Sequence, residues 1–150
     1  MFFIIHILMG ALIAKVFPSI IPIVLFSLIS HFILDFIPHW DGDFDDKTLN
    51  KKNKVNITRR TFILRTIDLI LAGGFLFLVY VNFQNYLMIL GALVSFLPDM
   101  TKGGYYLGFK NNKIFQKYLK FHTNIQSDPG IKVGLIIQIV IFIMLITAIF

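Results

Sequence analysis

The 150-residue chain contains no cysteine and no glutamate, and each absence excludes a class of chemistry. Without cysteine there is no disulfide framework, no thiolate metal site and no cysteine nucleophile. Without glutamate the H-E-x-x-H metalloproteases are excluded, because that motif needs a glutamate as its general base. All eight acidic residues are aspartates, so aspartate and the four histidines are the strong side-chain metal ligands that remain.

Charged residues are also scarce. They make up 15% of the chain, whereas hydrophobic residues make up 57% and the mean hydropathy is +0.78. Soluble domains carry roughly 25% charged residues, so this composition indicates an integral membrane protein, with residues 1–150 forming a single domain. We interpret the net charge of +6 first as a signal for how the chain is oriented in the membrane, and only second as a sign of nucleic-acid binding. No nucleic-acid partner is expected.

Five apolar segments are separated by turns or polar stretches, which predicts an all-α fold, a multi-pass transmembrane helical bundle. The segments are Phe2–Phe17, Ile20–Ile37, Thr61–Phe83, Tyr86–Leu97 and Gly130 or Ile131 to Phe150. The first is short for a span of about 20 residues, so it is expected to be tilted, embedded or incomplete. A signal peptide is the alternative, but no basic residue precedes the run and no small-residue cleavage site is found.

Residues 109–126 predict a helix of a different kind. At about 100° per residue, its lysines form one stripe and its apolar side chains lie on the opposite face. These two faces consist of Lys110, Lys113, Lys117 and Lys120, and of Phe115, Tyr118, Leu119, His122 and Ile125. The pattern is typical of an amphipathic helix in the membrane interface, although solvation of an exposed face would also account for the lysines.

The basic residues predict an orientation. Twelve of the 14 lie in or beside two stretches, 39–60 and 99–130. Five alternating spans would put both stretches on one side of the membrane. The positive-inside rule then places them in the cytoplasm, together with the N-terminus, for a protein of the inner or plasma membrane.

Ionisable side chains inside apolar segments are costly, so each one predicts a functional site. The topology brings nine of them, in or just beyond the apolar segments, to the cytoplasmic ends of their helices, which is the strongest functional signal in the sequence. Six are predicted to ligate metal: His6, His31, Asp35, His39, Asp99 and His122. Three more are predicted to be catalytic: Asp41, Asp68 and Arg65.

His31 and Asp35 are one helical turn apart and share a face, so both can ligate one cation. Imidazole combined with carboxylate favours zinc, with manganese or iron as alternatives. The number of ligands suits one or two ions. In a two-metal site, one ion lowers the pKa of a bound water and both stabilise charge developing on a phosphoryl or acyl oxygen.

An aspartate that does not ligate metal would act as the general base. Arg65, one turn before Asp68, would orient that carboxylate or hold an anionic group such as phosphate. Simpler interpretations stay open at this point. Arg65 and Asp68 would also suit a structural pair inside the membrane, His6 and His122 would suit packed or interfacial histidines, and Asp99 would suit a helix end.

Several short motifs in the chain resemble those of a family of small multi-pass membrane-bound metal-dependent hydrolases, the LexA-binding, inner-membrane-associated hydrolases. The motifs concerned are His6, Ser30-His31-x-x-x-Asp35, Pro98-Asp99 and His122-Thr123. The resemblance implies a metal-dependent hydrolase with ligands at these positions. His31, Asp35, Pro38 and His39 are more loosely similar to zinc-dependent phospholipase C and related nucleases, which implies phosphoester hydrolysis.

We therefore expect a membrane-embedded, metal-dependent hydrolase that acts on a phosphoester or ester of a lipid or amphiphile at the cytoplasmic interface. Membrane lipids are the expected partners, because the basic stretches would attract anionic headgroups. One alternative is a divalent-cation carrier or metal sensor, and another is a structural membrane protein. A carrier needs polar groups through the whole membrane thickness, and the opposite half of the predicted bundle has almost none.

Overall fold

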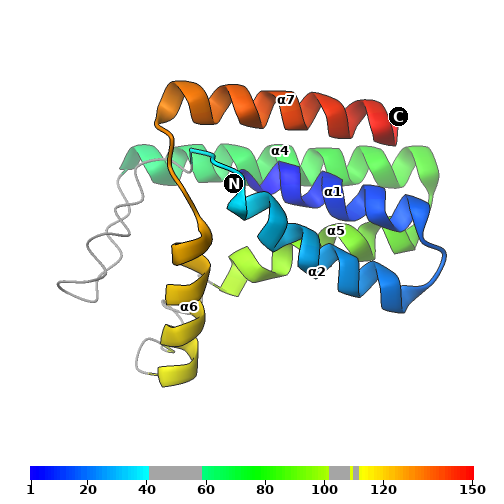
Figure 1. Cartoon of the computed structure of the whole chain (residues 1–150). Coiled ribbons are helices and arrows are strands. Elements are labelled where there is room, and N and C mark those ends of the chain that lie inside the picture. Colours follow the sequence, from blue (N-terminus) through cyan, green and yellow to red (C-terminus); the bar gives the residue numbers. More distant parts are fainter. Residues whose placement is uncertain (41–58, 102–108, 110–111) are drawn as a thin grey trace.

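The computed structural model describes residues 1–40, 59–101, 109 and 112–150. This part of the chain contains six helices and no strand, so the predicted all-α class is confirmed (Figure 1). The helices are α1 (Phe3–Val16), α2 (Ile20–Phe36), α4 (Arg59–Phe83), α5 (Tyr86–Met100), α6 (Lys113–Ile125) and α7 (Ile131–Ile149). Five of them coincide with the predicted apolar segments, and α6 coincides with the amphipathic one.

Two predicted helix boundaries are wrong by a few residues. The fourth apolar helix, α5, continues through Pro98 to Met100 instead of ending at Leu97. A proline lacks a backbone N–H, so one this close to a helix end removes a single intrahelical hydrogen bond and leaves the turn intact. The amphipathic helix α6 begins at Lys113, because the side chain of Asn112 caps it by accepting hydrogen bonds from the next turn.

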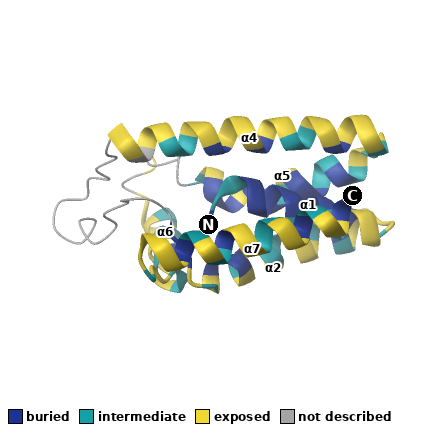
Figure 2. Cartoon of the chain, turned by 90° about the horizontal axis from the view of Figure 1, so that it is seen from above, coloured by how far each residue is buried: buried dark blue, intermediate teal, exposed yellow. Residues whose placement is uncertain are grey.

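Helix α1 lies at the centre of the bundle and packs against α2, α4, α5 and α7. Its inward side chains, such as Ile5, Leu8 and Ala11, are almost completely buried. In Figure 2 the buried residues concentrate along α1 and α5, whereas α4 and α7 are exposed along most of their length. Figure 1 shows that α1 and α2 run in opposite directions, as do α4 and α5. The N-terminus, the end of α2 and the end of α5 therefore meet at one end of the bundle.

Two glycines allow α1 and α5 to pack closely. A Cβ atom built on Gly10 would collide with the backbone carbonyl of Gly91, and one on Gly91 would collide with that of Gly10. The two backbones are thus nearly in contact at this crossing. Small residues at a helix crossing are typical of helix pairs in membranes, where close van der Waals packing drives association.

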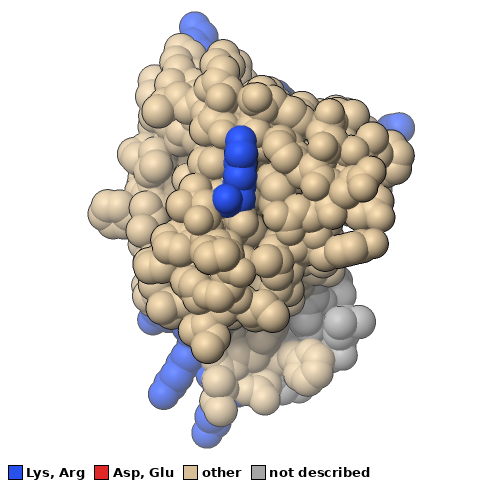
Figure 3. Space-filling model, turned by 90° about the vertical axis from the view of Figure 1, so that its right-hand side faces the viewer, with Lys and Arg blue, Asp and Glu red and all other residues tan. Residues whose placement is uncertain are grey.

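Two helices in the described part are long and apolar enough to cross a membrane, over Phe62–Phe83 and Ile131–Ile149. Only 17% of each window is buried inside the protein, so most of their apolar side chains face outward. The other apolar helices are shorter, with 14, 17 and 15 residues in α1, α2 and α5. The end of the bundle away from α6 faces the viewer in Figure 3, where the described residues show no acidic side chain and very few basic ones.

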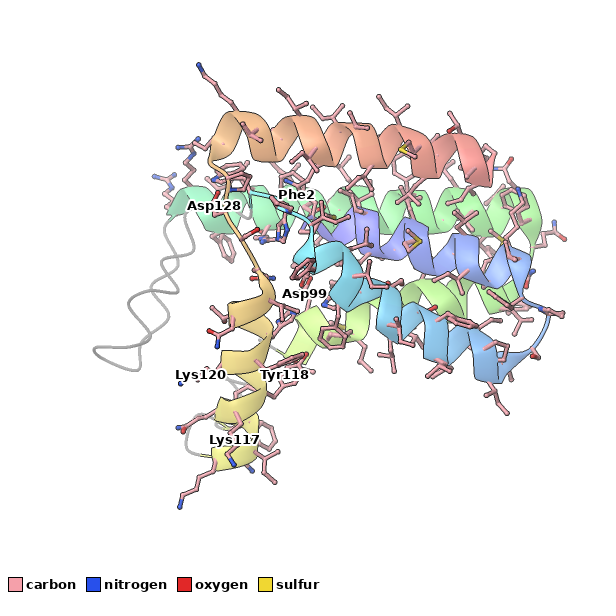
Figure 4. The ribbon with its side chains drawn as sticks, viewed as in Figure 1. Phe2, Asp99, Lys117, Tyr118, Lys120 and Asp128 are labelled. Atoms are coloured by element: carbon pink, nitrogen blue, oxygen red, sulfur yellow. The ribbon has the colours of Figure 1, made fainter. Side chains whose placement is uncertain are left out.

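Helix α6 projects across the end of the bundle instead of running along it (Figure 1). His122 is its one buried residue, and Lys113, Lys117 and Lys120 are exposed. Figure 4 shows Lys117 and Lys120 pointing away from the bundle, while the Tyr118 hydroxyl donates a hydrogen bond of 3.0 Å to the Pro98 carbonyl. The predicted separation of a lysine face from a face that carries His122 is therefore confirmed.

Candidate metal centre

Four buried side chains from three helices meet where α2, α5 and α6 converge. They are His31 and Asp35 from α2, Asp99 from α5 and His122 from α6. Each offers one ligand atom, and these atoms all lie within 4.8 Å of one another. All four were predicted as ligands from the sequence, and the structure shows that together they could hold a metal ion.

The spacing of three donor atoms suits a single small cation. The two Nε2 atoms of His31 and His122 are 3.0 Å apart. Asp35 Oδ2 lies 3.3 Å from His31 Nε2 and 2.9 Å from His122 Nε2. A tetrahedral ion with bonds of about 2.0–2.1 Å holds its ligand atoms roughly 3.3 Å apart, which is close to these three distances between donor atoms. Asp99 Oδ1 lies 3.9 Å from His122 Nε2 and completes the set.

The backbone orients the His31 ring. Its Nδ1 lies 2.8 Å from the Ser95 carbonyl oxygen, and because a carbonyl can only accept, Nδ1 must carry the proton and donate. In the neutral ring, Nε2 then has a free lone pair directed toward His122 and Asp35. A metal-ligating histidine commonly has its other ring nitrogen fixed in this way. The donor set thus fits a metal ion in its chemistry as well as in its spacing.

Two further predicted ligands lie beside the cluster. His6, on α1, is completely buried, with Nε2 at 3.2 Å from Asp35 Oδ1 and 3.7 Å from Asp99 Oδ2. His39, just after α2, has Nε2 at 3.9 Å from Asp35 Oδ1 and donates from Nδ1 to the Ile37 carbonyl at 2.7 Å. The Met1 amino group also reaches Asp35 Oδ1, at 2.9 Å. The structure therefore brings all six predicted ligands to one end of the bundle.

Asp68 and Arg65, on α4, contact the start of α1. Asp68 accepts hydrogen bonds from the backbone N–H groups of Phe3 and Ile4, at 2.6 and 3.2 Å. Arg65 donates to the Met1 carbonyl at 3.1 Å and lies 3.8 Å from Asp68. The pair fixes the first turn of the helix that carries His6, and the catalytic role predicted for it stays a prediction. Asp41, the third predicted catalytic residue, lies outside the described residues.

Sequence reasoning missed several groups that hold the cluster in place. The Gln126 amide donates to Asp35 Oδ2 at 3.0 Å, and Gln138 on α7 accepts from the Phe2 N–H at 2.9 Å. Gln126 lies one turn after His122, and Ser95, whose carbonyl orients His31, lies one turn before Asp99. Helical spacing from a predicted ligand is thus the signal that could have found Gln126 and Ser95.

Comparison with other proteins identifies no relative of the chain. No protein-family model matches the chain, and no curated protein or solved structure gives a match. The function must therefore be argued from the geometry of the site.

Proposed function

We propose that the chain is a multi-pass membrane protein that binds a divalent metal ion and hydrolyses a phosphoester or ester of a lipid or other amphiphile at the cytoplasmic interface. One observation carries this proposal. The His31, Asp35, Asp99 and His122 cluster is buried at one end of an apolar bundle, directly beside the amphipathic helix α6. Such a site could receive the headgroup of an amphiphile while its tail stays in the membrane.

The exposed surface of the bundle supports the membrane part of the proposal. Outward-facing side chains on α4 and α7 are large and apolar, for example Ile70, Phe77, Ile136 and Met144. Water would solvate such a surface poorly, and contiguous exposed apolar surface of this kind marks a protein or membrane interaction site. The shorter helices α1, α2 and α5 would cross or enter the same bilayer, since they pack alongside α4 and α7.

The donor set supports the metal part. Two imidazoles with two carboxylates suit zinc, manganese or iron better than magnesium or calcium, which prefer oxygen ligands alone. A divalent ion would supply Lewis acidity to water and to a phosphoryl or acyl oxygen. The chain's own residues would hold it: Ser95 fixes the His31 ring, and Gln126 fixes Asp35. Burial of all four side chains excludes bulk water from the site.

The charge on α6 supports an anionic headgroup as part of the substrate. Lys113, Lys117 and Lys120 are exposed on the helix that carries His122 into the cluster. Basic residues near an anionic leaflet contribute about 1 kcal/mol each to its attraction. These lysines lie on the opposite face of α6 from His122, so they would draw anionic lipids to this end of the bundle without contacting the metal centre themselves.

Metal content of the purified protein tests the proposal. The wild type is expected to retain about one equivalent of divalent metal or more, and the double variant His31→Ala with Asp35→Ala is expected to lose it. Asp128→Ala, which removes an exposed aspartate away from the cluster, is the control and should keep wild-type metal content. A metal-free wild type would refute the proposal. If metal is bound, hydrolysis of phospholipid and nucleotide esters distinguishes a hydrolase from a carrier or sensor.

A further inference from the structure

Each carboxylate at the centre presents its two oxygens to different histidines. Asp35 Oδ2 faces His31 and His122, at 3.3 and 2.9 Å, whereas Asp35 Oδ1 faces His6 at 3.2 Å. Asp99 divides in the same way, with Oδ1 at 3.9 Å from His122 and Oδ2 at 3.7 Å from His6. The centre thus has two sides that share both carboxylates.

We propose that Asp35 and Asp99 bridge two divalent metal ions. The first ion would lie among the donor atoms of His31, His122 and one oxygen of each carboxylate. The second would lie on the opposite side, held by His6 and the other oxygen of each carboxylate. This inference rests on the proposed metal site and adds a second ion to it.

The state of His6 supports the second position. The ring is completely buried, and its Nε2 lies 3.2 Å from Asp35 Oδ1, but neither ring nitrogen has the geometry of a hydrogen bond to any described residue. A buried polar group without a hydrogen bond is unfavourable, so it indicates a role or a missing partner. The ring also stacks on His31, with centroids 4.2 Å apart and an angle of 28° between the planes. His6 is therefore stacked on a ligand of the proposed first ion.

A positive charge already lies on the His6 side. The Met1 ammonium donates to Asp35 Oδ1 at 2.9 Å and lies 2.6 Å from His39 Nε2. His39 donates from Nδ1 to Ile37, so its Nε2 lone pair is directed toward the same place. Asp35 Oδ1 and His39 Nε2 therefore both contact one cation, the Met1 ammonium, on this side of the centre. The alternative is that the Met1 ammonium is the only cation on this side, and a test must exclude it.

Two ions would narrow the substrate class. A pair of metal ions stabilises both the attacking and the leaving oxygen of an in-line displacement, as in phosphatases and nucleases. Bridging carboxylates would keep the ions close enough to contact one phosphoryl group together. The second ion thus favours a phosphoester over a carboxylic ester as the substrate.

Manganese loading tests the second ion without relying on activity. The full-length protein, in detergent or nanodiscs, is loaded with Mn²⁺ and freed of excess metal, and bound Mn²⁺ per chain is measured together with the EPR spectrum. We expect two ions per wild-type chain with an exchange-coupled spectrum, because two Mn²⁺ ions that share carboxylates interact magnetically. His6→Ala should bind one ion and give the six-line spectrum of isolated Mn²⁺. Ser27→Ala, which removes a buried hydroxyl that is no predicted ligand, should behave as wild type.

The outcomes separate this inference from the proposed function. One isolated ion in the wild type, unchanged by His6→Ala, would overturn the second ion and leave the first in place. Two ions without exchange coupling would overturn the bridge. No bound ion in the wild type would overturn the proposed metal site as well. If His6→Ala does not fold, the wild-type stoichiometry and spectrum still decide, and His6→Gln serves as the second variant.

Discussion

Asp68 is an aspartate that caps a helix to which it does not belong. Its two carboxylate oxygens accept the N–H groups of Phe3 and Ile4, which have no partner within the first turn of α1. A negative charge at this position also matches the positive end of the helix dipole. His6 lies one turn further along α1, so the capping contact sets the position of a predicted ligand.

Replacing Asp68 should therefore destabilise the protein without removing a donor atom from the metal centre. Loss of a helix cap costs about 0.5–2 kcal/mol, and we expect Asp68→Ala to lower the free energy of unfolding by about that amount. Asp68→Asn should cost less, because its amide oxygen still accepts one of the two hydrogen bonds. Thermal unfolding in detergent micelles measures both variants against wild type.

Metal content provides the decisive control for this residue. Asp68→Asn should bind as much metal as wild type at a temperature where both are folded. If Asp68→Asn keeps the wild-type melting temperature and loses metal, the carboxylate acts at the metal centre, as the sequence alone had predicted, and its capping role is secondary.

At the scale of the elements, replacing a glycine by alanine is expected to have opposite effects on stability at two kinds of position. Gly10, on α1, lies against the backbone of α5, and any side chain there meets the Gly91 carbonyl. Gly73, on α4, has no atom within 4 Å of where its Cβ would be. The same substitution at the two positions thus tests whether α1 and α5 are in contact as described.

Gly10→Ala should destabilise the protein by about 1–3 kcal/mol, because the added methyl group forces two closely packed backbones apart. Gly73→Ala is the matched control and should be neutral or more stable by up to about 1 kcal/mol, because alanine favours the helix. Chemical or thermal unfolding of both variants in the same micelles gives the comparison. Equal stability of the two would contradict the close crossing of α1 and α5.

Helical spacing predicted most of what lies on a single element. His31 and Asp35 share a face of α2, and α6 has a lysine face opposite His122, as the sequence indicated. The end of α5 was predicted too early, at Leu97, because whether Pro98 ends a helix depends on how many residues of the helix follow it. The contact of Gly10 with Gly91 was not predicted either, since glycine carries no apolar signal that marks a packed face.

At the scale of the whole molecule, topology predicted which residues share one end but not which of them meet. Alternating helices place His6, Asp35, Asp68 and Asp99 at the same end, and the structure has them there. Whether Asp68 joins the cluster depends on how α4 is rotated about its own axis. A helix exposed along most of its length has no narrow apolar stripe to fix that rotation in the sequence. Asp68 consequently contacts α1 and not the metal centre.

The absence of cysteine makes the proposed orientation directly testable. Ser19, between α1 and α2, and Ser127, just after α6, are exposed serines at opposite ends of the bundle, and cysteine replaces serine with little change in size. In intact cells, a membrane-impermeant maleimide should label Ser19→Cys, whereas Ser127→Cys should be labelled only after the membrane is permeabilised. The wild type supplies the blank, since it has no thiol. The reverse pattern would invert the orientation, and the metal centre would then face the outside of the cell instead of the cytoplasm.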